Sequence, residues 1–137
     1  MKILISTIVG TIVLFILSWL SYSVIMAKYM VQFGPLMRTP EDMRFWAIIV
    51  GTVLEAFFLA WIYTLVYKGQ SPLKEGFLFG FFLSLLVDIP YIFFYWGSYA
   101  ISYKVIIADG ILMGIRMTIT AIVIALIIGK KEKVMES

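Results

Sequence analysis

The sequence predicts an all-α integral membrane protein, in which a single domain over residues 1–137 forms a bundle of four transmembrane helices. Composition is the first observation: 63% of the residues are hydrophobic, 14% are charged, and the mean hydropathy is +1.04. Soluble domains are about 45–50% apolar and about 25% charged, so this balance indicates a membrane protein. The second observation is that the apolar residues form four runs, each near the roughly 20 residues that a helix needs to cross a bilayer. We expect helices over approximately residues 3–26, 45–67, 76–96 and 105–128.

The residue types that the chain lacks exclude several kinds of chemistry. It has no cysteine and no histidine, which removes disulfides, thiolate nucleophiles and the usual ligands of zinc and haem. We therefore predict no metal site, no cofactor and no catalytic residue. The net charge of +3 is small and the basic residues gather near the ends of the apolar runs. This pattern suits contact with anionic membrane lipid rather than with nucleic acid.

The first apolar run carries small and hydroxyl-bearing residues at helical spacing, which allows transmembrane helices to pack closely. With Leu14 on the same stripe, these residues are Thr7, Gly10, Thr11, Ser18 and Ser21. The run is longer than the apolar core of a signal peptide, so we expect it to be a retained first helix.

The second and third helices are each predicted to begin at a hydroxyl residue followed by proline, which is favoured at helix N-termini. Thr39 and Pro40 precede the second apolar run, and the two acids after Pro40 favour the positive end of a helix dipole. Ser71 and Pro72 precede the third run. Because the turn around them is short, we expect the second and third helices to form an antiparallel hairpin.

The third run contains a stripe of small residues that ends at a carboxylate. Gly76, Gly80, Ser84 and Asp88 recur every four residues and so share one helix face. Such a stripe is more typical of close helix packing than of a ligand path. Pro90 follows directly and lacks a backbone donor, so we expect a kink there.

The fourth run is predicted to end at Gly129, before a cluster of lysines that would anchor it among lipid headgroups. The loops give the orientation. One side carries Lys2, Lys68, Lys74, Lys130, Lys131 and Lys133, and the other carries Lys28, Arg38, Arg44 and Lys104. By the positive-inside rule, both termini would face the cytoplasm of a multi-pass protein in a bacterial inner membrane.

Charged residues inside three of the runs are the strongest functional signal. Asp109 and Arg116 are seven residues apart and project from one face of the last helix. Counting along the helices places Glu55, Asp88 and Arg116 roughly 12–17 Å deep, near the midplane, and Asp109 roughly 6 Å deep. Facing lipid, the three central charges would together cost on the order of 8–10 kcal/mol. That rivals the whole stability of a small protein, so we expect them to face inward and to pair.

Two interpretations of these charges remain open. In the structural one, Arg116 bridges Glu55 or Asp88 and sets the helix register. In the functional one, three acids against one arginine leave a carboxylate that is protonated, binds a cation or faces a water-filled cavity. Tyr91 and Tyr95 continue around the face of Asp88, where aromatic residues either form an interfacial belt or line the mouth of a pocket. The candidate binding residues are thus Glu55, Asp88, Asp109, Arg116, Tyr91 and Tyr95.

In size and layout, the chain resembles a family of small four-helix bacterial membrane proteins catalogued as a domain of unknown function. The resemblance is carried by Gly10, the run from Trp19 to Tyr22, the proline-bearing polar loop, and Gly76 with Gly80 at the start of the third helix. That family usually has Leu-Trp-Tyr where this chain has Trp-Leu-Ser-Tyr. The resemblance implies the four-helix fold and no known activity. Small multidrug exchangers are similar in size but carry their membrane glutamate in the first helix, whereas Glu55 lies in the second.

The sequence supports three functional hypotheses. The first is a membrane protein whose polar centre binds or transports a proton, a cation or a small amphipathic ligand, either within one chain or across a homodimer. The second is an accessory subunit of a larger membrane complex, in which the charges serve as structural pairs. The third is a membrane-embedded enzyme that acts on lipid or isoprenoid by acid catalysis, with Asp88 or Glu55 as proton donor. We expect a non-enzymatic role, because the chain has no nucleophile or metal motif.

Overall fold

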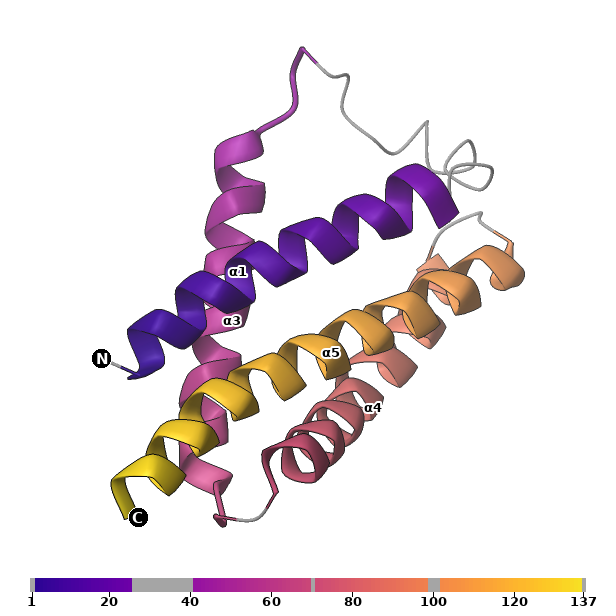
Figure 1. The fold of residues 1–137 in the computed structure, drawn as a ribbon. Coiled ribbons are helices and arrows are strands. Elements are labelled where there is room, and N and C mark those ends of the chain that lie inside the picture. Colours follow the sequence, from indigo (N-terminus) through magenta and orange to yellow (C-terminus); the bar gives the residue numbers. More distant parts are fainter. Residues whose placement is uncertain (1, 26–40, 70, 99–101, 137) are drawn as a thin grey trace.

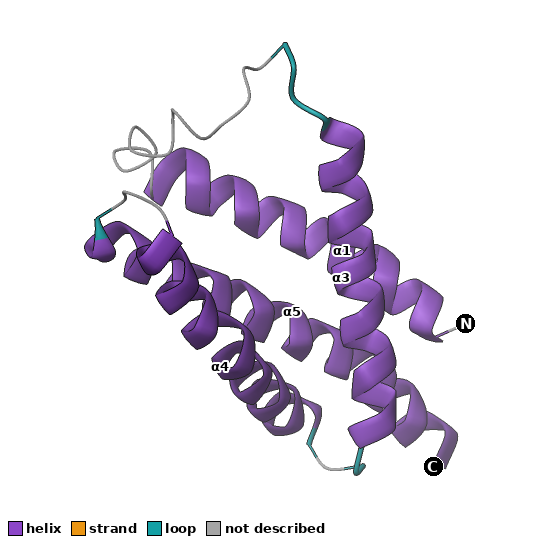
Figure 2. Ribbon diagram, turned by 180° about the vertical axis from the view of Figure 1, so that it is seen from behind, coloured by secondary structure: helices purple, strands orange, loops and turns teal. Residues whose placement is uncertain are grey.

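The computed structural model describes residues 2–25, 41–69, 71–98 and 102–136, and the regular structure within these ranges is helical (Figure 1 and Figure 2). The elements are α1 at Lys2–Leu20, the π-helical turn η1 at Ser21–Ile25, α3 at Phe45–Val66, α4 at Pro72–Ser98 and α5 at Tyr103–Glu136. Four stretches of 22–27 residues, with mean hydropathies of 2.0–2.5, are long and apolar enough to cross a membrane. The predicted all-α class and the four long apolar helices are confirmed.

The helices lie in an up-and-down arrangement. Helix α5 runs alongside both α1 and α4, whereas α3 crosses α1 obliquely (Figure 1). The start of α1 and the last turns of α5 lie at the same end of the molecule as the turn that joins α3 to α4. That turn contains Gly69, whose φ of 78° favours a residue without a side chain.

Helices α4 and α5 form the closest pair, and the stripe of small residues is the reason. The buried residues of α4 are Gly76, Gly80, Ser84 and Asp88. A Cβ atom on Gly80 would lie 2.7 Å from the Cα atom of Thr118 on α5, and one on Gly76 would lie 2.8 Å from the Cα atom of Ile122. Since those neighbours are backbone atoms, they cannot move aside as a flexible side chain would. The prediction that this stripe serves close helix packing is confirmed.

A second contact brings α1, α3 and α5 together at one point. A Cβ atom on Gly10 would lie 3.2 Å from the Cβ atom of Ala56 and 3.6 Å from Cγ2 of Thr120. Beyond this crossing, the second half of α3 contributes Leu59, Ala60 and Tyr63 to the main hydrophobic cluster, together with residues of α5. The first half of α3 is different: from residue 45 to residue 55, every residue except Thr52 is exposed.

Several predicted helix ends differ from the structure. Helix α4 does begin at Pro72. The predicted start at Thr39 and Pro40 lies outside the described residues, and the two acids that follow form a turn before α3 begins at Phe45. The predicted stop at Gly129 is wrong, because α5 continues to Glu136. Gly129 lies within α5 and faces Pro72 at the start of α4, where a Cβ atom on Gly129 would lie 2.9 Å from Cγ of Pro72. The small size of Gly129 therefore allows a contact between the two helices and does not mark a C-terminal cap.

The helix contact at Gly80 predicts opposite effects for two glycine substitutions within α4. Gly80→Ala should lower the free energy of unfolding by about 1–3 kcal/mol, because the new methyl group would press on the backbone of α5. Gly97→Ala is the control, because nothing lies within 4 Å of its Cβ position, and it should leave stability unchanged or slightly raised. Unfolding by SDS in mixed micelles, followed by circular dichroism, measures both. Equal stability of the two variants would contradict the packing role.

Candidate functional site

A fully satisfied polar contact surrounds Asp109. The Tyr22 hydroxyl donates to Oδ1 of Asp109 at 2.9 Å, and the Tyr91 hydroxyl donates to Oδ2 at 2.5 Å. Asp109 is 3% exposed, and the two tyrosines are half-buried. Because the three residues come from η1, α5 and α4, these hydrogen bonds join three separate elements and satisfy both carboxylate oxygens.

Arg116 lies beside this contact and is 9% exposed. Its Nη2 donates to the Tyr22 hydroxyl at 3.4 Å, and its Cζ atom lies 5.0 Å from the centre of the Tyr22 ring. The two-turn separation of Asp109 and Arg116 on α5 lets a single tyrosine side chain contact both. Tyr22 therefore connects the buried cation to a buried anion.

The expected direct ion pair of Arg116 with Glu55 or Asp88 is not formed. Within the part of the chain that the structure describes, the polar partner of Arg116 is Tyr22 and its Nη1 atom has none. Arg116 still lies close enough to attract both Glu55 and Asp88 electrostatically. Tyr22 instead lies against the guanidinium with both its ring and its hydroxyl, while Nη1 keeps no partner.

Asp88 is buried, 6% exposed, and lies where α4 faces α5. Its Oδ2 atom would be 2.9 Å from a Cβ atom on Gly114, so the glycine makes room for the carboxylate. Its Oδ1 atom is enclosed and has no hydrogen-bond partner. Among the described residues, four buried side-chain atoms lack such a partner: Ser6 Oγ, Tyr63 OH, Asp88 Oδ1 and Arg116 Nη1. The last two belong to this polar centre.

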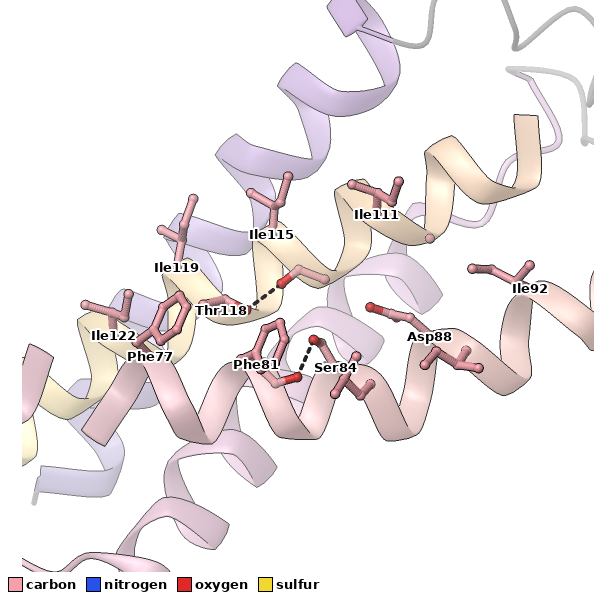
Figure 3. Close-up of a pocket in the computed structure, with 14 residues that line it drawn as sticks. Phe77, Phe81, Ser84, Asp88, Ile92, Ile111, Ile115, Thr118, Ile119 and Ile122 are labelled. Carbon is pink, nitrogen blue, oxygen red and sulfur yellow. Dashed lines mark hydrogen bonds between the residues drawn. The ribbon is translucent and has the colours of Figure 1, made fainter. Parts of the chain in front are cut away.

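Asp88 also lines a groove of about 580 Å³ between α4 and α5 (Figure 3). The sides are formed by Phe77 and Phe81 of α4 and by isoleucines of α5, including Ile111 and Ile115. Figure 3 shows Asp88 on α4, in the space between the two helices, on the same groove as these apolar side chains. The volume falls within the roughly 300–1,000 Å³ that is typical of small-molecule sites.

A smaller hollow of about 300 Å³ adjoins the groove, because Ile92 lines both. Its other lining residues are Phe93, Trp96, Tyr103 and Ile107. Aromatic residues at the end of α4 and the start of α5 thus line a hollow.

The six predicted binding residues separate into four groups. Asp109, Arg116 and Tyr91 are brought together in one hydrogen-bonded network, and Asp88 lies in the groove beside it. Tyr95 is 36% exposed and packs on Tyr91 with ring centres 4.2 Å apart. Glu55 departs from expectation, because its side chain is exposed rather than inward-facing.

Tyr22 is a central residue of this network that the sequence pattern does not identify. An aromatic residue near the end of a transmembrane helix is typical of an interfacial anchor, and no local spacing distinguishes Tyr22 from one. Its contact with Asp109 joins residues 87 positions apart. Such a contact depends on how α1 lies against α5.

The site holds no group of three or more His, Cys, Asp or Glu residues placed to bind a metal ion, as far as the described residues go. No protein-family model, curated protein or solved structure matches the chain. Its class is therefore defined by its own features: an all-helical protein with four helices apolar enough to cross a membrane and a polar centre between them. The resemblance to small four-helix membrane proteins stays a prediction.

The network predicts a specific loss of stability in Tyr22→Phe. This variant removes the hydroxyl that donates to Asp109 and accepts from Arg116, and it leaves both charged groups short of a partner. We expect the free energy of unfolding to fall by about 1–3 kcal/mol. Tyr103→Phe is the matched control, because Tyr103 is 53% exposed. Denaturation in mixed micelles compares the two; a Tyr22→Phe variant as stable as the control would contradict this role.

Proposed function

We propose that this chain is an integral membrane protein that crosses the bilayer four times and binds or transports a proton, a cation or a small amphipathic ligand at its polar centre. The four long apolar helices support membrane insertion. The larger number of basic residues at the end that carries Lys2 and the α3–α4 turn supports a cytoplasmic position for both termini. A bacterial inner membrane is the location that we propose.

One observation carries the functional part of the proposal: a buried carboxylate with an unpartnered oxygen lines a groove of ligand size. Buried polar groups in folded proteins are nearly always hydrogen-bonded, so an exception in a groove points to a missing partner. Asp109, by contrast, has both oxygens occupied by tyrosines. Asp88 is thus the acid available to a ligand, and the groove favours a ligand with an apolar part.

Native mass spectrometry of the protein, extracted with its surrounding lipid, tests this function. We expect a small molecule bound to the wild type and lost in Asp88→Asn, which keeps the size of the side chain and removes its charge. Glu41→Gln is the control for the change in charge, because Glu41 is exposed in a turn outside the helices. An identical set of bound molecules in all three proteins would argue against a binding site at Asp88.

A second function, as a subunit of a larger membrane assembly, is favoured by the exposed first half of α3. Eleven residues there include Trp46, which is 67% exposed, and the acid Glu55. An acid that faces lipid near the midplane costs about 2.5–3.5 kcal/mol on insertion scales, so a protein surface against Glu55 would stabilise the helix in the membrane. A second copy of the chain or another subunit would supply that surface.

Crosslinking from α3 tests this second function, and the absence of cysteine from the chain makes a single-site label possible. Gly51→Cys places the label one turn from Glu55, where nothing lies within 4 Å of the Cβ position. After labelling with a maleimide-benzophenone and irradiation in native membranes, we expect a protein adduct of dimer mass or larger. Leu86→Cys on α4, 70% exposed in the wild type, is the lipid-facing control. A label at Gly51 that captures no more protein than the control would count against an assembly through α3.

Acid catalysis remains a third hypothesis from the sequence. The unpartnered Asp88 carboxyl group would be its proton donor. A change in host lipid or isoprenoid composition on deletion of the protein is the observation that would support it.

A further inference from the structure

We propose that the groove between α4 and α5 binds a protonated amine on an apolar body, and that Asp88 receives the ammonium group. This inference rests on the proposed binding function and narrows it to one class of ligand. The inference is supported by the hydrogen-bonding groups that line the groove, by the charges near Asp88 and by the apolar side chains of the groove.

The polar side chains of the groove offer acceptors to a ligand and no donor. Ser84 uses its single hydroxyl hydrogen to donate to the carbonyl oxygen of Phe81 at 2.7 Å, and Thr118 donates to the carbonyl oxygen of Gly114 at 2.8 Å (Figure 3). A hydroxyl that donates its one hydrogen keeps its lone pairs, and an ionised carboxylate is an acceptor alone. The polar part of a ligand must therefore supply the donors.

The charges near the groove favour a cationic donor. Among the described residues that line the groove, none is lysine or arginine. Arg116 contacts Tyr22 and does not pair directly with Asp88. The carboxylates of Glu55, Asp88 and Asp109 lie near this one arginine. Of the three, only Asp109 has both oxygens hydrogen-bonded. An added ammonium group would neutralise Asp88 and supply up to three N–H donors.

One oxygen of the Asp88 carboxylate can reach such a group. In the structure, Oδ1 is enclosed and the side chain is 6% exposed. Rotation of the carboxyl group about its last side-chain bond meets a broad, two-fold energy profile. This rotation exchanges the two oxygens, so either oxygen can face the groove while the other takes the enclosed position.

The walls of the groove suit the apolar part of the ligand. The rings of Phe77 and Phe81 lie 5.9 Å apart and nearly parallel, with 9° between their planes. Ile111 and Ile115, one helical turn apart on α5, line the groove from the opposite helix. The adjoining aromatic hollow extends the apolar surface past Ile92, which would hold a longer alkyl chain.

A primary amine should bind better than a quaternary ammonium ion of the same length. Both carry a positive charge, and both can lie against the aromatic rings. A quaternary nitrogen has no N–H, however, so it cannot satisfy Asp88 by hydrogen bonding. Loss of a charge-assisted hydrogen bond typically weakens binding by about tenfold or more.

Four ten-carbon compounds test the ligand class: decylamine, decyltrimethylammonium, 1-decanol and decanoate. Their binding is measured by equilibrium titration with the full chain in nanodiscs of uncharged phosphatidylcholine, and binding to empty nanodiscs is subtracted. We expect decylamine to bind at least tenfold more tightly than the other three. Asp88→Asn should remove this preference while leaving the weak binding of 1-decanol unchanged.

A second variant guards against an effect of Asp88→Asn on folding. Ile111→Trp would fill the groove from a position that is 58% exposed, so it should block decylamine without disturbing the core. Ile8→Trp on α1, 54% exposed and outside the groove, is its matched control and should bind as the wild type does. Circular dichroism and thermal unfolding verify that each variant is folded.

The outcomes separate this inference from the proposed function. Equal affinity for decylamine and 1-decanol, or a preference for decanoate or decyltrimethylammonium, would overturn the amine inference and leave ligand binding at Asp88 intact. Absence of binding for all four compounds would also overturn it. The Asp88-dependent ligand sought by native mass spectrometry would then decide the proposed function on its own.

Discussion

The close approach of α4 and α5 determines where the other groups of this protein lie. The contact brings the backbone of α5 so near to Gly76 and Gly80 that neither position can hold a side chain without displacing it. The same stripe continues to Asp88, and the same closeness presses its carboxylate into the space left by Gly114. A packing motif that would be unremarkable in any membrane helix pair thus buries a charged group at its end. The groove on the outer side of this pair follows from the same geometry, because the two helices touch along their small residues and separate along their large ones.

The buried charges show how the chain distributes a limited number of polar partners. Tyr22 and Tyr91 satisfy Asp109 completely, and Tyr22 also engages Arg116. This network does not extend to Asp88, whose free oxygen is its consequence. Hydrogen-bonded tyrosines stabilise an anion in a low-dielectric interior without adding a second charge. A tyrosine between Asp109 and Arg116 therefore replaces the ion pair that a simple count of charges suggests.

The two candidate functions use different faces of the molecule and do not exclude each other. The ligand groove lies between α4 and α5 and includes Asp88. The exposed surface that favours a partner lies on the first half of α3, before its crossing with α1 near Gly10 and Ala56. A ligand at Asp88 and a protein surface at Glu55 would each compensate one acid. The protein contains too few cations to compensate both acids within a single chain, because Arg116 is the one basic residue inside the apolar runs.

Composition and helical periodicity determined the helical class, the four long apolar helices and the stripe on α4, because each is a local property of the chain. The burial of Asp88, Asp109 and Arg116 was also predictable, since charges in a membrane helix must avoid lipid.

The tertiary structure alone decided their partners. Helix periodicity says which face of α5 carries Asp109, but not that Tyr22, 87 residues earlier, would reach it. Likewise, the exposure of Glu55 depends on the direction of α3 before it crosses α1 at Ala56, and the contact between Gly129 and Pro72 depends on how α5 lies against α4. Contacts between distant residues are set by the packing of whole helices, which no short stretch of sequence encodes.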